Sequence, residues 1–173
     1  LWILLDPCCG SGTIPIEAAM AGHNIAPGLG RKFASEEWEI IDAGMWKEER
    51  RKAYEAITDE PLRIYASDVD PRSMKAAIEN AANAGVEEDI HFKQINITDI
   101  KRADYSSPAD SNGIIIVNPP YGKRIGEEKA IATIYESLRR FHADNPDWSL
   151  FMITADKTVE KKIWKFLRSG CVS

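Results

Sequence analysis

The chain contains 173 residues, of which 44% are hydrophobic and 28% are charged, values that are ordinary for a single globular domain with a sizeable core. Its formal net charge of −5 argues against a domain that holds long nucleic acid by charge alone. No apolar run approaches the length of a membrane-spanning helix, and no signal peptide is recognisable, so we expect no membrane partner.

The three cysteines, Cys8, Cys9 and Cys171, do not form the even, spaced set of a disulfide framework. This usage favours a reducing, cytoplasmic compartment. Because Cys8 and Cys9 are adjacent and lack the spaced partners of a zinc site, we expect no metal.

The first unit of the chain begins with an apolar run over residues 1–5, which predicts a buried strand. The segment Asp6-Pro7-Cys8-Cys9-Gly10-Ser11-Gly12-Thr13 follows, and a helix is expected over residues 14–21. Strand, glycine loop and helix in this order are typical of a Rossmann-like fold. Pro15 stands where a phosphate-binding loop has its third glycine, so Asp6 and the loop favour a ligand with an amino-acid end over a pyrophosphate. The alternative is a structural glycine turn capped by Asp6.

Residues 22–61 form an insertion before the next strand. A helical region is expected over residues 35–57, with a break near Gly44. Four large apolar residues in this region have helical spacing, which predicts a face buried in the core: Trp38, Ile41, Met45 and Trp46.

The second strand is expected over residues 62–66, and acidic residues follow it. Asp70 is predicted to cap a helix that ends at Gly85, so it has a structural role. No such role is evident for Asp68, and an acid at the end of the second strand of this fold type holds ribose hydroxyls. The third strand is expected over residues 90–94, and Asp99 after it is either an acceptor for an adenine amino group or an exposed loop acid.

A fourth apolar run, residues 113–117, predicts a buried parallel strand that ends in Asn118-Pro119-Pro120-Tyr121. The prolines stop the ladder and stiffen the backbone. The Asn118 side chain and the Pro119 carbonyl can accept the two hydrogens of an amino group, while Tyr121 stacks on a flat ring. An ordinary proline-rich turn is the alternative.

The last part of the chain predicts a helix over residues 131–142, a strand over residues 148–154 and a helix capped by Asp156. Lysines make this last helix basic, which indicates either a solvated face or contact with a phosphate backbone. We therefore expect an α/β fold with a Rossmann-like, doubly wound, mostly parallel sheet, in one domain over residues 1–173.

Taken together, Asp6-x-x-x-Gly10-x-Gly12, Asp68, Asp99 and the Asn118 tetrapeptide resemble class I AdoMet-dependent methyltransferases. The Ala26–Trp38 segment, with the loop and helix after Asp6, is similar more specifically to the THUMP-associated RNA methylases, which are bacterial 23S rRNA guanine-N2 methyltransferases often labelled N6-adenine DNA methylases.

This resemblance implies S-adenosyl-L-methionine as cofactor, S-adenosyl-L-homocysteine as product and RNA as substrate. It places Asp6, Gly10 and Gly12 around the methionine part, Asp68 at the ribose, Asp99 at the adenine, and Asn118, Pro119 and Tyr121 at the target base. It also assigns Pro7, Cys9, Thr13 and Val69 to the cofactor site, together with Asn118, which serves both sites. The family's N-terminal THUMP domain, the helix before the first strand and the final strand pair are not recognisable, so we expect a catalytic domain truncated at both ends, with RNA docking by a domain outside this chain.

Three other functions compete with this interpretation. An adenine-N6 DNA methyltransferase carries the same tetrapeptide, and a non-catalytic AdoMet-binding module needs only the cofactor residues. A nicotinamide dehydrogenase is disfavoured by the absent third glycine.

Overall fold

The computed structural model describes residues 2–105, 112–120 and 128–154. Within them, five strands form one sheet in the order β3-β2-β1-β4-β5, and every neighbouring pair is parallel. The strands are β1 (Ile3–Asp6), β2 (Ile64–Asp68), β3 (Ile90–Gln94), β4 (Gly113–Val117) and β5 (Trp148–Met152). This confirms the predicted Rossmann-like α/β fold.

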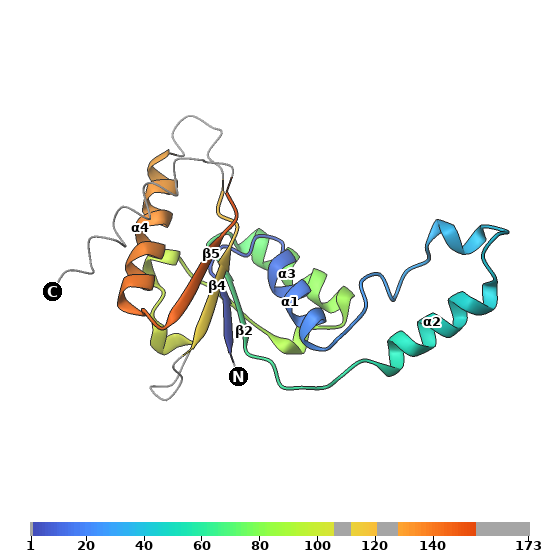
Figure 1. Ribbon diagram of the computed structural model, residues 1–173. Coiled ribbons are helices and arrows are strands. Elements are labelled where there is room, and N and C mark those ends of the chain that lie inside the picture. Colours follow the sequence, from blue (N-terminus) through green and yellow to red (C-terminus); the bar gives the residue numbers. More distant parts are fainter. Residues whose placement is uncertain (1, 106–111, 121–127, 155–173) are drawn as a thin grey trace.

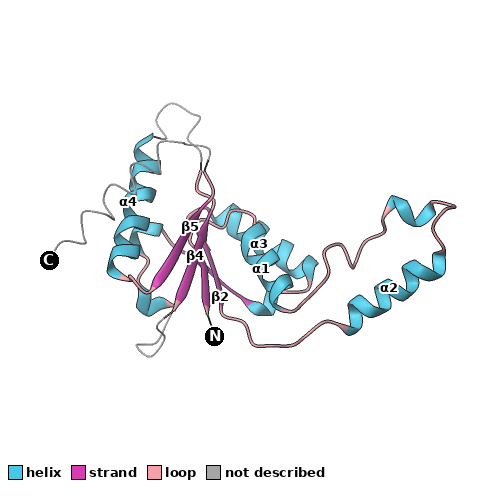
Figure 2. Cartoon of the chain, in the orientation of Figure 1, coloured by secondary structure: helices cyan, strands magenta, loops and turns pink. Residues whose placement is uncertain are grey.

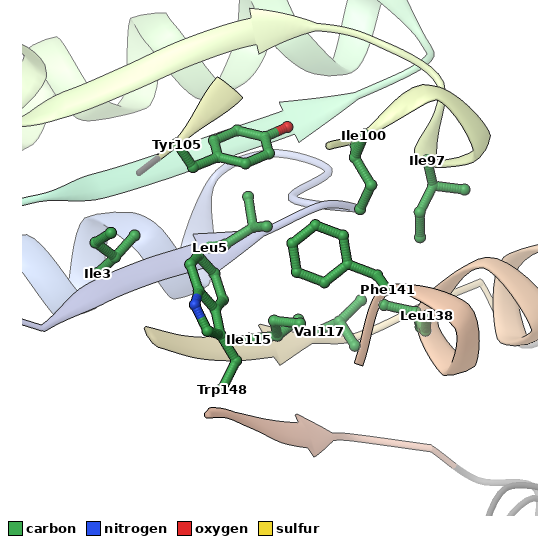
Figure 3. Close-up of a cluster of buried hydrophobic side chains, with 10 residues drawn as sticks. All are labelled: Ile3, Leu5, Ile97, Ile100, Tyr105, Ile115, Val117, Leu138, Phe141 and Trp148. Atoms are coloured by element: carbon green, nitrogen blue, oxygen red, sulfur yellow. The ribbon is translucent and has the colours of Figure 1, made fainter. Parts of the chain in front are cut away.

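Helices cover both faces of the sheet (Figures 1 and 2). Helices α1 (Thr13–Gly22) and α3 (Pro71–Ala84) pack on one face, and α4 (Glu128–Asp144) packs on the other beside the short helix η3 (Ile97–Asp99). Each face has its own apolar core, because alternate residues of a strand point to opposite faces. Ile3 and Leu5 lie in the core beneath α4, which Figure 3 shows, whereas Ile64 and Ala66 lie beneath α1 and α3.

The tightest packing in the core beneath α4 is at Gly113, the first residue of β4. Any Cβ at this position would overlap the indole ring of Trp148, which is buried at the start of β5. Trp148 in turn meets Phe141 of α4 edge to face, with ring centroids 5.6 Å apart. The glycine therefore leaves room for Trp148, the largest buried side chain of this core.

The insertion extends away from the sheet as an arm formed by residues 24–62 (Figure 1). It contains η1 (Ala34–Glu37) and α2 (Ala43–Glu55). Arg50 of α2 braces the arm by donating to the Leu29 and Arg31 carbonyls and pairing with Glu36.

The prediction of a core-facing stripe on this arm is wrong. Trp38 and Met45 are 56% and 63% exposed, and Ile41 is only partly buried. Trp46 stacks on Phe33 within the arm itself, with centroids 5.7 Å apart. The arm has no sheet beside it to pack against, so helical spacing of apolar residues here gives no burial.

Element boundaries differ from the predictions by a few residues. The second strand begins and ends two residues later than expected, which makes Asp68 its last residue. α4 is longer at both ends, and β5 ends at Met152. The predicted caps of α3 are present, since Asp70 accepts the Arg72 N–H and Gly85 takes a left-handed conformation. Three predicted features lie outside the described residues, namely Tyr121, Cys171 and the helix expected after Asp156.

Candidate active site

The loop after β1 is held by hydrogen bonds at its base. The Cys8 N–H donates to Asp6 Oδ1 over 3.1 Å, and the Cys9 N–H donates to the Ser67 carbonyl of β2 over 2.9 Å. The Gly12 N–H donates to the Cys9 carbonyl over 2.8 Å, which closes the turn before α1. The loop is thus fixed against the carboxyl ends of both strands.

Two glycines of this loop have left-handed backbone conformations for different reasons. Gly12 has φ +87°, and a Cβ there would lie 3.1 Å from the Ala77 Cβ of α3. Gly10 has φ +54° and no heavy atom within 4 Å of an added Cβ. Gly12 therefore serves close packing on α3, whereas Gly10 leaves space open beside the backbone.

Asp68 joins the two halves of this edge. Its Oδ2 accepts the Gly10 N–H over 3.0 Å and its Oδ1 accepts the Asp70 N–H over 2.9 Å. The prediction that Asp68 has no structural role is therefore wrong, because it holds the glycine loop against the end of β2. Each carboxylate oxygen can accept a second hydrogen bond, so Asp68 can also bind ligand hydroxyls.

Strand register makes this edge of the sheet a trough. Asp6 of β1 is in register with Ala66 of β2, and Leu5 is in register with Ile115 of β4. Asp68 and Asn118 consequently stand two residues beyond the level of Asp6, or about 6–7 Å along the strands. Asp6 lies at the floor, and the two longer strands form walls on either side.

Asp6 is enclosed by this arrangement, with an exposed fraction of 1%. Burial raises the pKa of its carboxyl group from 3.8 to about 7; the Cys8 N–H opposes this shift, and the nearby Asp68 charge adds to it. A positive group placed in the trough would favour the ionised carboxylate.

A cleft of about 490 Å³ occupies the trough, within the range of small-molecule sites. Its lining residues come from the carboxyl ends of four strands and from α4: Pro7, Cys8, Gly10, Asp68, Val69, Asn96, Ile97, Asn118, Pro120, Ala130, Thr133 and Ile134. The cleft therefore brings together five of the predicted site residues, namely Pro7, Gly10, Asp68, Val69 and Asn118.

Six other predicted site residues that the structure describes do not line the cleft. Four of them are buried behind it: Asp6, Cys9, Gly12 and Pro119. Thr13 is exposed at the start of α1. Burial also raises the pKa of Cys9, like that of Cys8 in the cleft wall, to about 12, so both remain thiols at neutral pH.

Asp99 does not reach this cleft. It is exposed in an adjoining groove of about 420 Å³, where its Oδ1 accepts from the Thr98 hydroxyl over 3.2 Å. Asn96 lines the cleft instead, and its Oδ1 caps η3 by accepting the Thr98 N–H. Sequence reasoning missed Asn96, although its place just beyond a strand end is the same signal that identified Asp68.

The described residues contain no helix with both the length and the apolar composition to cross a bilayer. Over the same ranges, no three His, Cys, Asp or Glu side chains are grouped so that they could bind a metal ion.

Comparison with protein families matches residues 3–170 to the RMKL-like methyltransferase domain. The chain belongs to this family. The Bacillus subtilis protein YpsC, whose name classes it as a candidate RNA methyltransferase, is 42% identical over 158 residues, which are 91% of this chain and 40% of YpsC. The ribosomal RNA large subunit methyltransferase K/L of Shewanella sp. (strain W3-18-1) is 38% identical over 159 residues, 88% of this chain and 22% of that protein.

A solved structure of similar fold is that of SMU.472, a methyltransferase complexed with S-adenosylhomocysteine (SAH). It has a TM-score of 0.83 and 38% sequence identity, and the match covers 94% of this chain and 42% of that chain. This member of the RMKL-like family therefore spans less than half of the relatives that it matches.

Proposed function

We propose that this domain catalyses AdoMet-dependent methylation of an exocyclic amino group of a base in RNA, with guanine N2 in 23S rRNA as the target. The observation that carries the proposal is the position of Asp68 and Asn118 on opposite walls of one cleft. The first is an acceptor for sugar hydroxyls, and the second is an acceptor for amino hydrogens. Family membership and the names of the K/L relatives support the reaction class and the RNA substrate.

The residues on the β2 wall fit AdoMet. Asp68 retains lone pairs for two vicinal hydroxyls after holding Gly10 and Asp70. Val69, which is 60% exposed, offers an apolar surface next to it for an aromatic ring. Asp6 below the loop favours a ligand that carries positive charge. When bound, AdoMet supplies a methyl group attached to a positively charged sulfur. For Asp99, contact with the adenine requires the ligand to reach from the cleft into the adjoining groove.

On the β4 wall, Asn118 Oδ1 accepts one amino hydrogen of the base and so orients the nitrogen lone pair towards the cleft. Pro119, whose side chain is buried, is the proposed acceptor of the other hydrogen through its carbonyl. Tyr121 is proposed to stack on the base. With no strong base in this set, the residues act by positioning the amine and by stabilising the charge that develops on nitrogen.

The negative net charge of the chain weakens its own binding to RNA. A net charge of −5 cannot supply the phosphate contacts that dominate nucleic-acid affinity. Because the chain spans 40% of YpsC and 22% of the K/L protein, we propose that a domain outside it docks the RNA, as in THUMP-associated methylases, and that the protein acts in the cytoplasm.

The test compares rRNA nucleosides by mass spectrometry from cells with and without the gene, together with radiolabelled methyl transfer to rRNA and to duplex DNA. We expect loss of N2-methylguanosine at one position and label in rRNA. Label in DNA alone would show an adenine-N6 DNA methyltransferase instead.

A second measurement separates catalysis from cofactor binding. Asn118→Ala is expected to bind SAH in calorimetry like the wild type but to transfer no methyl group. Unchanged turnover in this variant would refute the assigned role of Asn118.

A further inference from the structure

Helix α4 has one apolar stripe that serves two different purposes along its length. Leu138 and Phe141 are buried in the core beneath the helix, and Ile134 packs against them. One helical turn towards the N-terminus, the same stripe continues to Ala130, with Thr133 beside it. These residues line the cleft, not the core, and Ala130 and Thr133 are exposed.

Ala130 and Thr133 line the cleft because α4 begins beyond the edge of the sheet. β4 ends at Val117 and β5 at Met152, and Figure 1 shows the first turns of α4 next to these carboxyl ends. The stripe therefore has sheet beneath it only from about Ile134 onwards. Its first turn faces the space that Asn118 and Pro120 border.

We infer that this first part of α4, made of Ala130, Thr133 and Ile134, is the wall on which the target base lies, and that Thr133 selects guanine over adenine. The inference rests on the proposed function, because it assigns the residues that read the base delivered to Asn118. The β1, β2 and β3 loops supply most of the other lining residues, and we assign these to the cofactor.

Thr133 already makes a hydrogen bond within the helix. Its hydroxyl donates to the Lys129 carbonyl over 3.0 Å, and while this bond is kept the oxygen can only accept from a ligand. Guanine carries an N1–H donor directly beside its 2-amino group. Adenine carries a bare N1 acceptor beside its 6-amino group. In the inferred pose, with the amino group at Asn118 and the ring on this wall of the same cleft, the Thr133 acceptor pairs with the N1–H of guanine and faces an unpaired lone pair on adenine.

Ala130 and Ile134 complement this selection by shape. The methyl group of Ala130 takes little space on the wall, and Ile134 is half-buried and apolar. A flat ring can lie on such a surface without losing polar contacts. A larger side chain at position 130 would occupy the place of the ring.

The test uses the purified full-length protein and a hairpin RNA that contains the nucleotide identified in the rRNA experiment. This nucleotide is synthesised as guanosine or as 2,6-diaminopurine riboside, which keeps the 2-amino group but has an acceptor at N1. We expect the wild type to methylate guanosine with a kcat/KM roughly tenfold or more above that for the analogue. Thr133→Val, which keeps the shape and removes the acceptor, should lower kcat/KM for guanosine by about tenfold and abolish the preference.

Two further variants control the interpretation. Ala130→Leu should reduce transfer to both hairpins and leave SAH affinity within about twofold, since the added volume lies at the base end. Thr58→Val makes the same chemical change on the exposed arm and should alter neither rate.

The outcomes separate the two proposals. If the wild type binds no SAH and methylates neither RNA, the proposed function itself is refuted. If it methylates guanosine and Thr133→Val retains the full preference, only the role of Thr133 is refuted. Loss of SAH binding in Ala130→Leu would assign this wall to the cofactor and overturn the inference.

Discussion

Gly12→Ala should destabilise the domain more than the same substitution at the left-handed glycines Gly10 and Gly85, which have open space around them. Placing alanine at φ +87° costs roughly 1–2 kcal/mol in backbone strain. The new Cβ would also lie 3.1 Å from the Ala77 Cβ and 3.2 Å from its Cα, in a fully buried part of α3. Such overpacking adds typically about 1–3 kcal/mol, so we expect a total loss of about 2–5 kcal/mol.

Two matched variants isolate these contributions. Gly85→Ala, at φ +74° with open space around it, should cost only the backbone strain of about 1–2 kcal/mol and leave SAH binding unchanged. Gly10→Ala, at φ +54°, should cost a similar free energy but lower SAH affinity, because Gly10 lines the cleft. Urea unfolding and calorimetry with SAH measure both quantities. Equal stability losses for Gly12→Ala and Gly85→Ala would show that the loop does not pack on α3 as described.

Three other predictions follow from the site and the core. Asp68→Ala should lower SAH affinity by tenfold or more, which is on the order of the loss of charged hydrogen bonds. Asp99→Ala should have a smaller effect because Asp99 lies outside the cleft. The reverse order in calorimetry would show that Asp68 does not bind the ribose. Burial raises the Asp6 pKa to about 7, so between about pH 4 and pH 7 the folded chain binds more protons than the unfolded chain. The free energy of unfolding should therefore fall as pH rises through this window, by on the order of 4 kcal/mol at most. Asp6→Asn should remove this pH dependence in urea titrations. Gly113→Ala should cost about 3 kcal/mol or more because its Cβ overlaps the Trp148 ring, and near-native stability in thermal unfolding would contradict this packing.

The sequence was informative wherever a residue's role depends on its place relative to a strand end. The five strands, the glycine loop and the side chains of Asp68 and Asn118 all follow from apolar runs and the polar residues that end them. Asn96 follows from the same rule and was overlooked because Asp99 matched the expected acid. The wall on α4 was not predictable, since alanine and threonine carry no functional signal until the start of the helix is known relative to the sheet.

The arm shows where prediction from the sequence fails. Helical spacing of Trp38, Ile41 and Met45 predicted burial, but spacing only shows that apolar residues share one side of a helix. Burial also requires a second surface beside that side. The sheet covers its faces with α1, α3 and α4, so the arm extends past it. Its rigidity comes from Arg50 and the Phe33–Trp46 stack, which are contacts between residues 13 or more positions apart that no local pattern indicates.

Strand register, which the sequence does not encode locally, determines how the residues at this edge of the sheet lie relative to one another. β1 is the central strand. Its last residue, Asp6, lies two residues short of Asp68 on the β2 side and two residues short of Asn118 on the β4 side. Helix α1, which follows β1, packs on one face, while α4, the helix after β4, packs on the opposite face, so the trough lies between the two connections. Asp6 at the floor then lies about 6–7 Å below the level of the Asn118 amide, while the glycine loop rises to the level of Asp68, which accepts the Gly10 N–H. The glycine loop and Asn118 therefore border one cleft from its two sides, so the proposed transfer from a ligand on the loop to a base at Asn118 takes place across that cleft.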